Sequence, residues 1–304
     1  MSPPMPAPRI GPALRAAAKL GLLALALALP AAGMARDRSI LWTVEGHHNT
    51  VYLLGSVHVL RPGDAALPDA AERAFDDAEQ LVMEIDVDDP GSDPLSMAMQ
   101  MQQAAMLPAG QTLKGVLGSD YTSINERAQE SGIDLEALDA FAPWFVAIAL
   151  LDLELAKRGF SPEFGIEQTL AARAIEQHKP IEGLETAAQQ FQMLASMPLA
   201  QQKRFLVMTL DESAQLDREL EALLRAWRTG DTEALAALLA GEYEDFPDLY
   251  RRLTVERNRA WVGRLADLLD DRDDYLVVVG ALHLVGPDSV VDLLRQRGYT
   301  VTQQ

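Results

Sequence analysis

The chain of 304 residues contains no cysteine and only five histidines. The lack of cysteine excludes disulfides, thiolate zinc sites, iron–sulfur clusters and cysteine nucleophiles. Cationic residues are also scarce, with 26 Lys and Arg against 45 Asp and Glu and a formal net charge of -19. Because such a charge repels phosphate backbones, we expect no nucleic-acid partner. Histidine, carboxylate, arginine and serine side chains remain to carry any chemistry.

Long apolar runs are missing as well. The stretch Leu20–Leu29 is uninterrupted, but it falls short of the ~20 residues that span a bilayer. Three cationic residues precede it and small residues follow as far as Ala35, which is typical of a Sec-type signal peptide. We therefore predict a signal peptide over residues 1–35 with cleavage near Ala35. The protein is then periplasmic or secreted and has no stable membrane span after cleavage; an uncleaved N-terminal anchor helix is the alternative.

Strand and helix patterns are segregated along the chain. Runs typical of strands fall near both ends, at residues 40–45, 50–54, 81–87, 275–279 and 299–302. The first two flank a turn and indicate a hairpin. From about 96 to 274 helical spacing dominates, with one short strand expected from Ile181. We predict a mixed α/β (α+β) fold in a single domain over residues 36–304. Its central mixed β-sheet comes from the N- and C-terminal parts and encloses a large helical insertion.

Two octets at opposite ends of the chain share one pattern. Leu53–Leu60 and Val278–Val285 both read apolar, apolar, Gly, small, apolar, His, apolar, apolar, and each follows a β-rich run. A strand that ends in Gly turns sharply and presents the His at its carboxyl end, where open α/β sheets bind ligands. If the strands are neighbours, His58 and His283 converge. Without cysteine, such a pair suggests a divalent metal held by nitrogen and oxygen ligands; a hydrogen-bonded core histidine is the alternative for each.

Such a site also needs a carboxylate. Glu84 lies inside the apolar run 81–87, where an acid is costly unless it is paired or bound to a metal. We predict Glu84 as a metal ligand or as the catalytic base. Asp86 shares its face and is a weaker candidate. The alternative for both is an edge strand with one face in water.

An arginine interrupts the apolar stripe of the last long predicted helix, over residues 249–269. Arg257 falls between Leu253 and Trp261 at helical spacing, so its guanidinium should pair with a carboxylate or point into a polar cavity. Two roles stay open, a structural ion pair and stabilisation of an oxyanion in catalysis. Its neighbour Asn258 is a candidate for orienting a ligand. Glu185, which precedes a capping-box pattern at 186–189, is another candidate catalytic acid.

These residues together resemble the TraB/GumN family of PrgY- and Tiki-like proteins over nearly the whole chain after the signal peptide. The resemblance rests on Gly55–His58, Glu84, Gly183–Thr186, Glu256–Asn258 and Gly280–His283, in that order. It implies an α/β fold distantly similar to erythromycin esterases and haem-binding ChaN-like proteins. In Tiki-like members the two histidines and a glutamate are tied to divalent-metal-dependent proteolysis, with manganese or cobalt favoured over zinc. That implication transfers to His58, His283 and Glu84.

The predicted function is an exported, divalent-metal-dependent hydrolase that acts on a peptide or protein substrate. His58, His283 and Glu84 would hold the metal, and Arg257 would stabilise the oxyanion. Two alternatives stay open: an esterase-like hydrolase that uses the histidines without metal, and a non-enzymatic module that binds a peptide, haem or metal. The absence of an HExxH motif excludes a conventional zincin.

Overall fold

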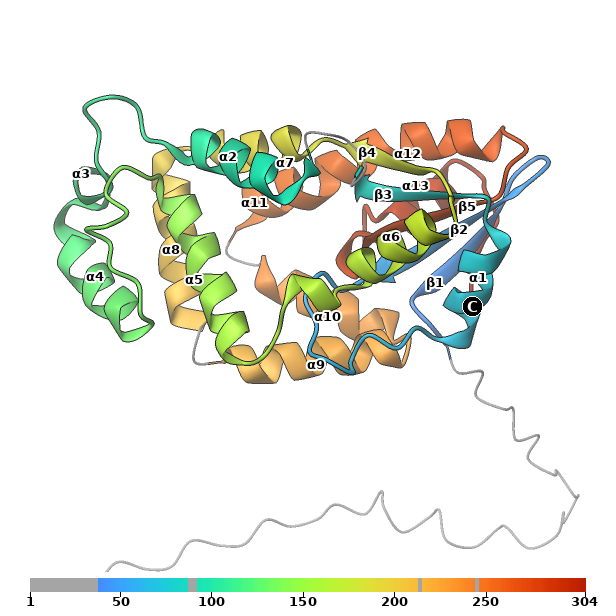
Figure 1. The fold of residues 1–304 in the computed structure, drawn as a ribbon, viewed down its shortest axis with the longest axis horizontal. Helices are drawn as coiled ribbons and strands as arrows, with labels where there is room; N and C mark the ends of the chain where they lie inside the picture. Colours follow the sequence, from blue (N-terminus) through green and yellow to red (C-terminus); the bar gives the residue numbers. More distant parts are fainter. Residues whose placement is uncertain (1–37, 87–91, 213–214, 244–245) are drawn as a thin grey trace, which may run out of the picture. The chain divides into compact units, whose positions relative to one another are not determined.

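A computed structural model describes residues 38–86, 92–212, 215–243 and 246–304 (Figure 1). The predicted signal peptide over residues 1–35 lies outside these ranges, as does Val87 of the predicted strand. Residues 37–304 cluster as one compact unit. In the described ranges, no helix is both long enough and apolar enough to cross a membrane.

A six-stranded mixed sheet forms the centre of this unit, as predicted. The strands are β1 (Leu41–Glu45), β2 (Thr50–Ser56), β3 (Gln80–Ile85), β4 (Ile181–Glu185), β5 (Tyr275–Gly280) and β6 (Val301–Gln303), in the order β4-β3-β5-β2-β1-β6. The expected hairpin is β1–β2, and β6 is the expected edge strand beside β1. The short strand expected from Ile181 is β4, so the mostly helical middle of the chain also supplies one edge of the sheet.

The central strands place the two Gly-x-x-His turns side by side. β5 is fully buried and pairs in parallel with β2 on one side and β3 on the other. Gly55 lies opposite Val279, and Ser56 lies opposite Gly280, so both strands end at the same edge of the sheet. Since β3 lies between β4 and β5, the alternative of a wet edge strand for Glu84 is wrong.

Gly55 is required by packing. A Cβ atom there would lie 2.2 Å from Ile40 Cγ2 and 3.0 Å from Ala281 Cα, which belongs to the other Gly-x-x-His turn. The Gly55 carbonyl also accepts a 2.7 Å hydrogen bond from Trp227 Nε1. Because Gly55 has no side chain, the two Gly-x-x-His turns can approach each other.

Helices surround the sheet and extend beyond it. They are α1 (Asp69–Asp77), α2 (Pro94–Ala105), α3 (Leu113–Leu117), α4 (Tyr121–Glu130), α5 (Pro143–Lys157), α6 (Ile166–Glu176), α7 (Ala187–Ala195), α8 (Leu199–Glu212), α9 (Leu216–Arg228), α10 (Thr232–Glu242), α11 (Pro247–Tyr250), α12 (Glu256–Leu269) and α13 (Val290–Gln296). One buried cluster surrounds the sheet, and a second lies among helices that include α4, α5 and α8. The long helix predicted over 249–269 is interrupted by a π-helical turn, Arg251–Val255. Such turns often occur at functional sites, and Arg257 is the second residue after this one.

Candidate functional site

The predicted site residues converge at the carboxyl ends of the central strands. Glu84 comes from β3, Glu185 from β4, and the two histidines from the turns after β2 and β5; α12 supplies Arg257 and Asn258. Hydrogen bonds and ion pairs connect all six in one network, either directly or through one another. Asp86 lies just beyond β3 and is half-buried.

Arg257 is the centre of this network. Its Nη2 forms ion pairs with Glu84 and Glu185, and its Nε donates to Glu185 Oε1 at 2.9 Å. Its Nη1 donates to the Leu253 carbonyl at 3.2 Å and lies 3.1 Å from His283 Nε2. These contacts use all five N–H groups of the guanidinium. The structure thus shows an ion pair, and an N–H could reach an oxyanion only if one of these bonds opened.

His283 has both ring nitrogens engaged. Because a guanidinium can only donate, Nε2 accepts from Arg257 and the proton sits on Nδ1. Nδ1 then donates to Asn258 Oδ1 at 2.7 Å, and Asn258 Nδ2 donates to the Asp288 carbonyl at 2.9 Å. The His283 ring also lies against Trp261, with ring centroids 4.6 Å apart. Asn258 therefore orients His283, a role close to the ligand-orienting one expected for it.

His58 is oriented by a residue that the sequence analysis missed. Its Nδ1 lies 2.5 Å from Glu167 Oε1, on α6, and Ser56 Oγ donates to the same oxygen. The other oxygen, Glu167 Oε2, is buried and has no hydrogen-bond partner among the described residues. The sequence signal that could have found Glu167 is its position in the first turn of a helix that begins directly after a glycine, Gly165. Because glycine has no side chain, the start of this helix can lie close to the backbone of His58. A Cβ on Gly165 would lie 2.2 Å from the His58 carbonyl oxygen.

The three predicted metal ligands differ in pKa because their electrostatic surroundings differ. Burial raises the pKa of Glu84, but the positive charges of His283 (when protonated), Arg257 and His58 outweigh it and lower the pKa to about 2. Burial lowers the pKa of His283 to about 4, against the opposing charge of Glu84. The protein around the His58 imidazole removes part of its hydration and so lowers its pKa, but the charge and hydrogen bond of Glu167 raise it to about 9. At neutral pH, Glu84 is ionised, His283 is neutral and His58 is protonated.

The surroundings of Gly280 show whether the predicted ligands could hold a cation. A Cβ there would lie 3.1 Å from His58 Nε2, 3.4 Å from Glu84 Oε1 and 3.6 Å from His283 Cδ2. Two donor atoms therefore lie close to one point, and the carboxylate on His58 Nδ1 is the usual support for an imidazole ligand. His283 turns a carbon toward the same point. Among the residues that the structure describes, no group of three His, Asp or Glu is placed to hold a metal.

A second missed residue links the two carboxylates. Gln190, on α7, donates through Nε2 to Glu185 at 2.8 Å and to Glu84 at 3.3 Å. The capping box predicted at Thr186 and Gln189 is present and starts α7 at the end of β4. The cap fixes the first turn of α7 and so positions Gln190 over the carboxylates.

A cavity of about 590 Å³ adjoins His58. Its walls come from α5, α8, α9 and α10, and Val59 and Leu282 from the two Gly-x-x-His turns also line it. The side chain of His58 is 61% exposed, so the imidazole faces this space and not the hydrophobic core. The cavity therefore gives a ligand access to the histidine.

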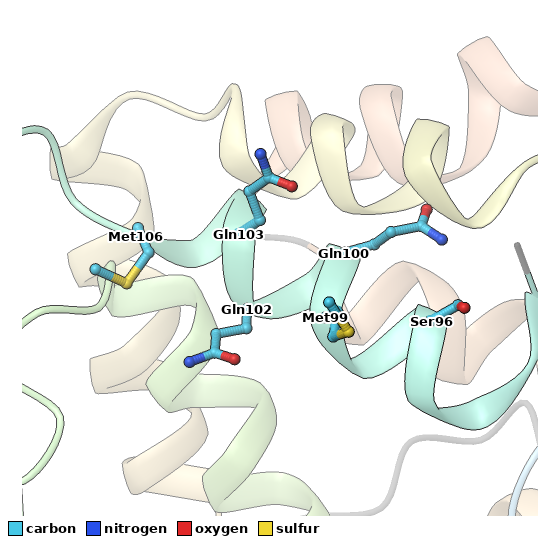
Figure 2. A pocket seen from close by; sticks show the side chains of 6 residues that line it. All are labelled: Ser96, Met99, Gln100, Gln102, Gln103 and Met106. Carbon is cyan, nitrogen blue, oxygen red and sulfur yellow. The ribbon is translucent and has the colours of Figure 1, made fainter.

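Another hollow lies along α2, away from these residues. Figure 2 shows the side chains that line it, which are Ser96, Met99, Gln100, Gln102, Gln103 and Met106. None of these six side chains is a histidine or a carboxylate, the nitrogen and oxygen ligands expected for a divalent metal in this chain. The hollow does not contribute to the site.

Comparisons with known proteins identify relatives of this chain and the family to which it belongs. YbaP of Shigella flexneri is 28% identical over 83% of this chain and 90% of its own length, and YbaP of Escherichia coli K12 is 28% identical over 80% and 87%. A Xenopus tropicalis protein named metalloprotease TIKI2 is 26% identical over 86% of this chain and 59% of its own. No solved structure matches. The profile of the TraB/PrgY/gumN family matches residues 40–303, which include both Gly-x-x-His turns and every residue of the cluster, and the chain therefore belongs to that family.

Proposed function

We propose that the chain is a hydrolase of peptide bonds whose site holds a divalent cation between His58 Nε2 and Glu84 Oε1. The observation that carries the proposal is the closeness of these two donor atoms to one point, the Cβ position of Gly280, at 3.1 Å and 3.4 Å. The relation to a protein named metalloprotease supports both the metal and a peptide or protein substrate. Manganese or cobalt is proposed before zinc, on the family resemblance.

The surrounding residues suit these roles. Glu167 holds the imidazole through Nδ1 and leaves Nε2 toward Glu84. Glu84 is fixed by Arg257 and by the Gly280 N–H, which donates to Oε1 at 2.8 Å. A carboxylate with a pKa of about 2 is a weak base at neutral pH, so Glu84 serves better as a ligand than as the base. A divalent cation supplies Lewis acidity toward the scissile carbonyl and acidifies water.

His283 remains a proposed third ligand under one condition. Its Nε2 lone pair is directed at Arg257, so it binds a cation only after that contact opens. Until then His283 helps to position Arg257 and, through it, Glu84.

The direct test is a peptide-library assay on the purified protein before and after chelation. The proposal expects turnover that EDTA removes and that manganese or cobalt restores. Turnover that persists in EDTA would favour a second candidate, acid–base hydrolysis without metal. One observation supports that candidate, since His58 paired with Glu167 is protonated at neutral pH and can donate a proton.

Replacing Gly280 by Ala should weaken cation binding strongly without unfolding the protein. The backbone of Gly280 has φ -50 and ψ 134, which alanine adopts readily, but the new methyl group fills the space between His58 Nε2 and Glu84 Oε1. We expect a loss of Mn²⁺ affinity of about 100-fold, comparable to the loss of supporting contacts at metal sites. Gly263→Ala is the matched control, because nothing lies within 4 Å of its Cβ position. Equal Mn²⁺ affinity in the two variants would contradict the proposed position.

Cation affinity should rise with pH. A cation can bind His58 Nε2 only after the proton leaves, and the pKa of His58 is raised to about 9, so affinity gains about tenfold per pH unit below that value. We expect Mn²⁺ to bind about 100-fold more tightly at pH 8 than at pH 6, with release of about one proton, measured by calorimetry. Glu167→Gln removes the charge that raises this pKa and should flatten the rise above about pH 6.5. A pH-independent affinity in the unmodified protein would argue against His58 as a ligand.

A further inference from the structure

The cavity beside His58 has a composition that restricts what it binds. Most of the described residues that line it are aliphatic, aromatic or methionine side chains; the polar ones are His58, Glu154, Thr209 and Glu219. Thr209 donates to the Phe205 carbonyl at 3.0 Å, and Glu154 is paired with Lys157 and Arg158. Glu219 is exposed. His58 is paired with Glu167, so three of the four polar side chains are already engaged by the protein itself.

The volume of the cavity is larger than one amino-acid side chain can fill. An apolar cavity of about 150 Å³ holds a benzene ring, and this one measures about 590 Å³. The occupant is therefore a long apolar group. A peptide of several apolar residues has the right volume, but it also brings backbone N–H and C=O groups, which are costly to bury without partners. A hydrocarbon chain brings none.

We propose that this cavity binds a long acyl chain of the substrate, with the carbonyl end of the chain at His58. The placement of the carbonyl end rests on the proposed function, whereas binding of the chain does not. Val59 and Leu282 flank the two site histidines in the sequence and both line the cavity, so the chain leads directly to the site. The substrate class is an acylated peptide or another acyl amide or ester.

The chain offers a pair of variants that isolates the cavity. Ala237, on α10, lines it, whereas Ala240 on the same helix is not among its lining residues, and both are exposed. Ala237→Trp should fill the space, and Ala240→Trp should leave it open. Met208→Gln is a second cavity variant on α8 that changes polarity with little change in volume.

The test measures binding of one soluble dipeptide carrying acyl chains of six, eight, ten or twelve carbons, in the presence of a chelator so that metal-dependent hydrolysis does not interfere. Affinity should increase by up to about fourfold for each added methylene until the cavity is full. Ala237→Trp should lower the affinity for the twelve-carbon probe at least tenfold and Met208→Gln by a smaller factor, while Ala240→Trp matches the unmodified protein.

Three results would overturn the inference. Affinity could be independent of chain length, both cavity variants could bind as the control does, or a tetra-leucine peptide could bind more tightly than the twelve-carbon probe. The last result would assign the cavity to apolar peptides. Binding is measured on metal-free protein, and hydrolysis is measured separately with added manganese. Acyl binding without any hydrolysis in manganese would refute the proposed function alone. Metal-dependent peptide hydrolysis without chain-length dependence would refute the acyl cavity alone.

Discussion

Replacing Arg257 by Met should lower the free energy of unfolding by about 3–5 kcal/mol, the usual cost of removing one partner from a buried ion pair. The side chains of Arg257, Glu84 and Glu185 are 13%, 9% and 13% exposed, so the substitution leaves two carboxylates buried without their cation. Urea denaturation at pH 7 measures the effect. The deficit should shrink in acid, because Glu84 loses the charge that holds its pKa down and can protonate in the folded variant.

The matched control for this prediction lies on the same helix. Arg264 pairs with Glu182, but these side chains are 46% and 44% exposed, and such surface pairs contribute about 0–1 kcal/mol. Arg264→Met should therefore have a small effect. The double variant Arg257→Met with Glu84→Gln should recover part of the loss, because one buried charge is removed with its partner. Equal destabilisation by Arg257→Met and Arg264→Met would show that the network around Arg257 contributes little to the fold.

The second large effect is on turnover. His58→Ala and Glu84→Gln should each lower kcat/KM by about 10²-fold or more, because each removes a donor atom facing the proposed cation position. His58→Ala should remain folded, since the side chain is 61% exposed. Glu167→Gln should lose about 10- to 100-fold, as is usual for a residue that supports a ligand. The assay is the peptide library with added manganese.

A surface histidine provides the comparison for these variants. His47 pairs with Asp270 at 2.9 Å, and its side chain is 77% exposed. His47→Ala should retain full activity. If His58→Ala also retained full activity in manganese, His58 would have no part in the reaction, whatever its position.

Much of the sheet could be predicted because its strands carry local signals. The apolar run of β5 and the turn between β1 and β2 mark strands directly. The repeated Gly-x-x-His pattern predicted that the two histidines converge if β2 and β5 are neighbours, and the structure shows that they are. Glu84 could be predicted as a site residue from sequence alone, because an acid inside an apolar strand is costly unless it is paired or bound to a metal. For Arg257, sequence alone left an ion pair and an oxyanion role open, and its full set of N–H contacts distinguishes them in the described arrangement.

Other features depend on contacts between distant parts of the chain. Glu167 lies 111 residues from Ser56, and in sequence it is one of many acids in the first turn of a helix, a position that favours carboxylates everywhere. Gln190 is likewise a polar residue in an ordinary amphipathic helix until α7 is placed over β3 and β4. The π-helical turn before α12 adds a residue to the helical repeat. A prediction that assumed regular α-helical spacing over 249–269 could not detect this turn.

The central claim is that a divalent cation sits between His58 and Glu84. Crystals grown with Mn²⁺ and measured at the manganese absorption edge test it most directly. The account predicts an anomalous peak within bonding distance of both His58 Nε2 and Glu84 Oε1, and none in crystals of Gly280→Ala. A well-ordered site in which the His58 and Glu84 side chains contact each other or water, with manganese bound elsewhere or not at all, would contradict it.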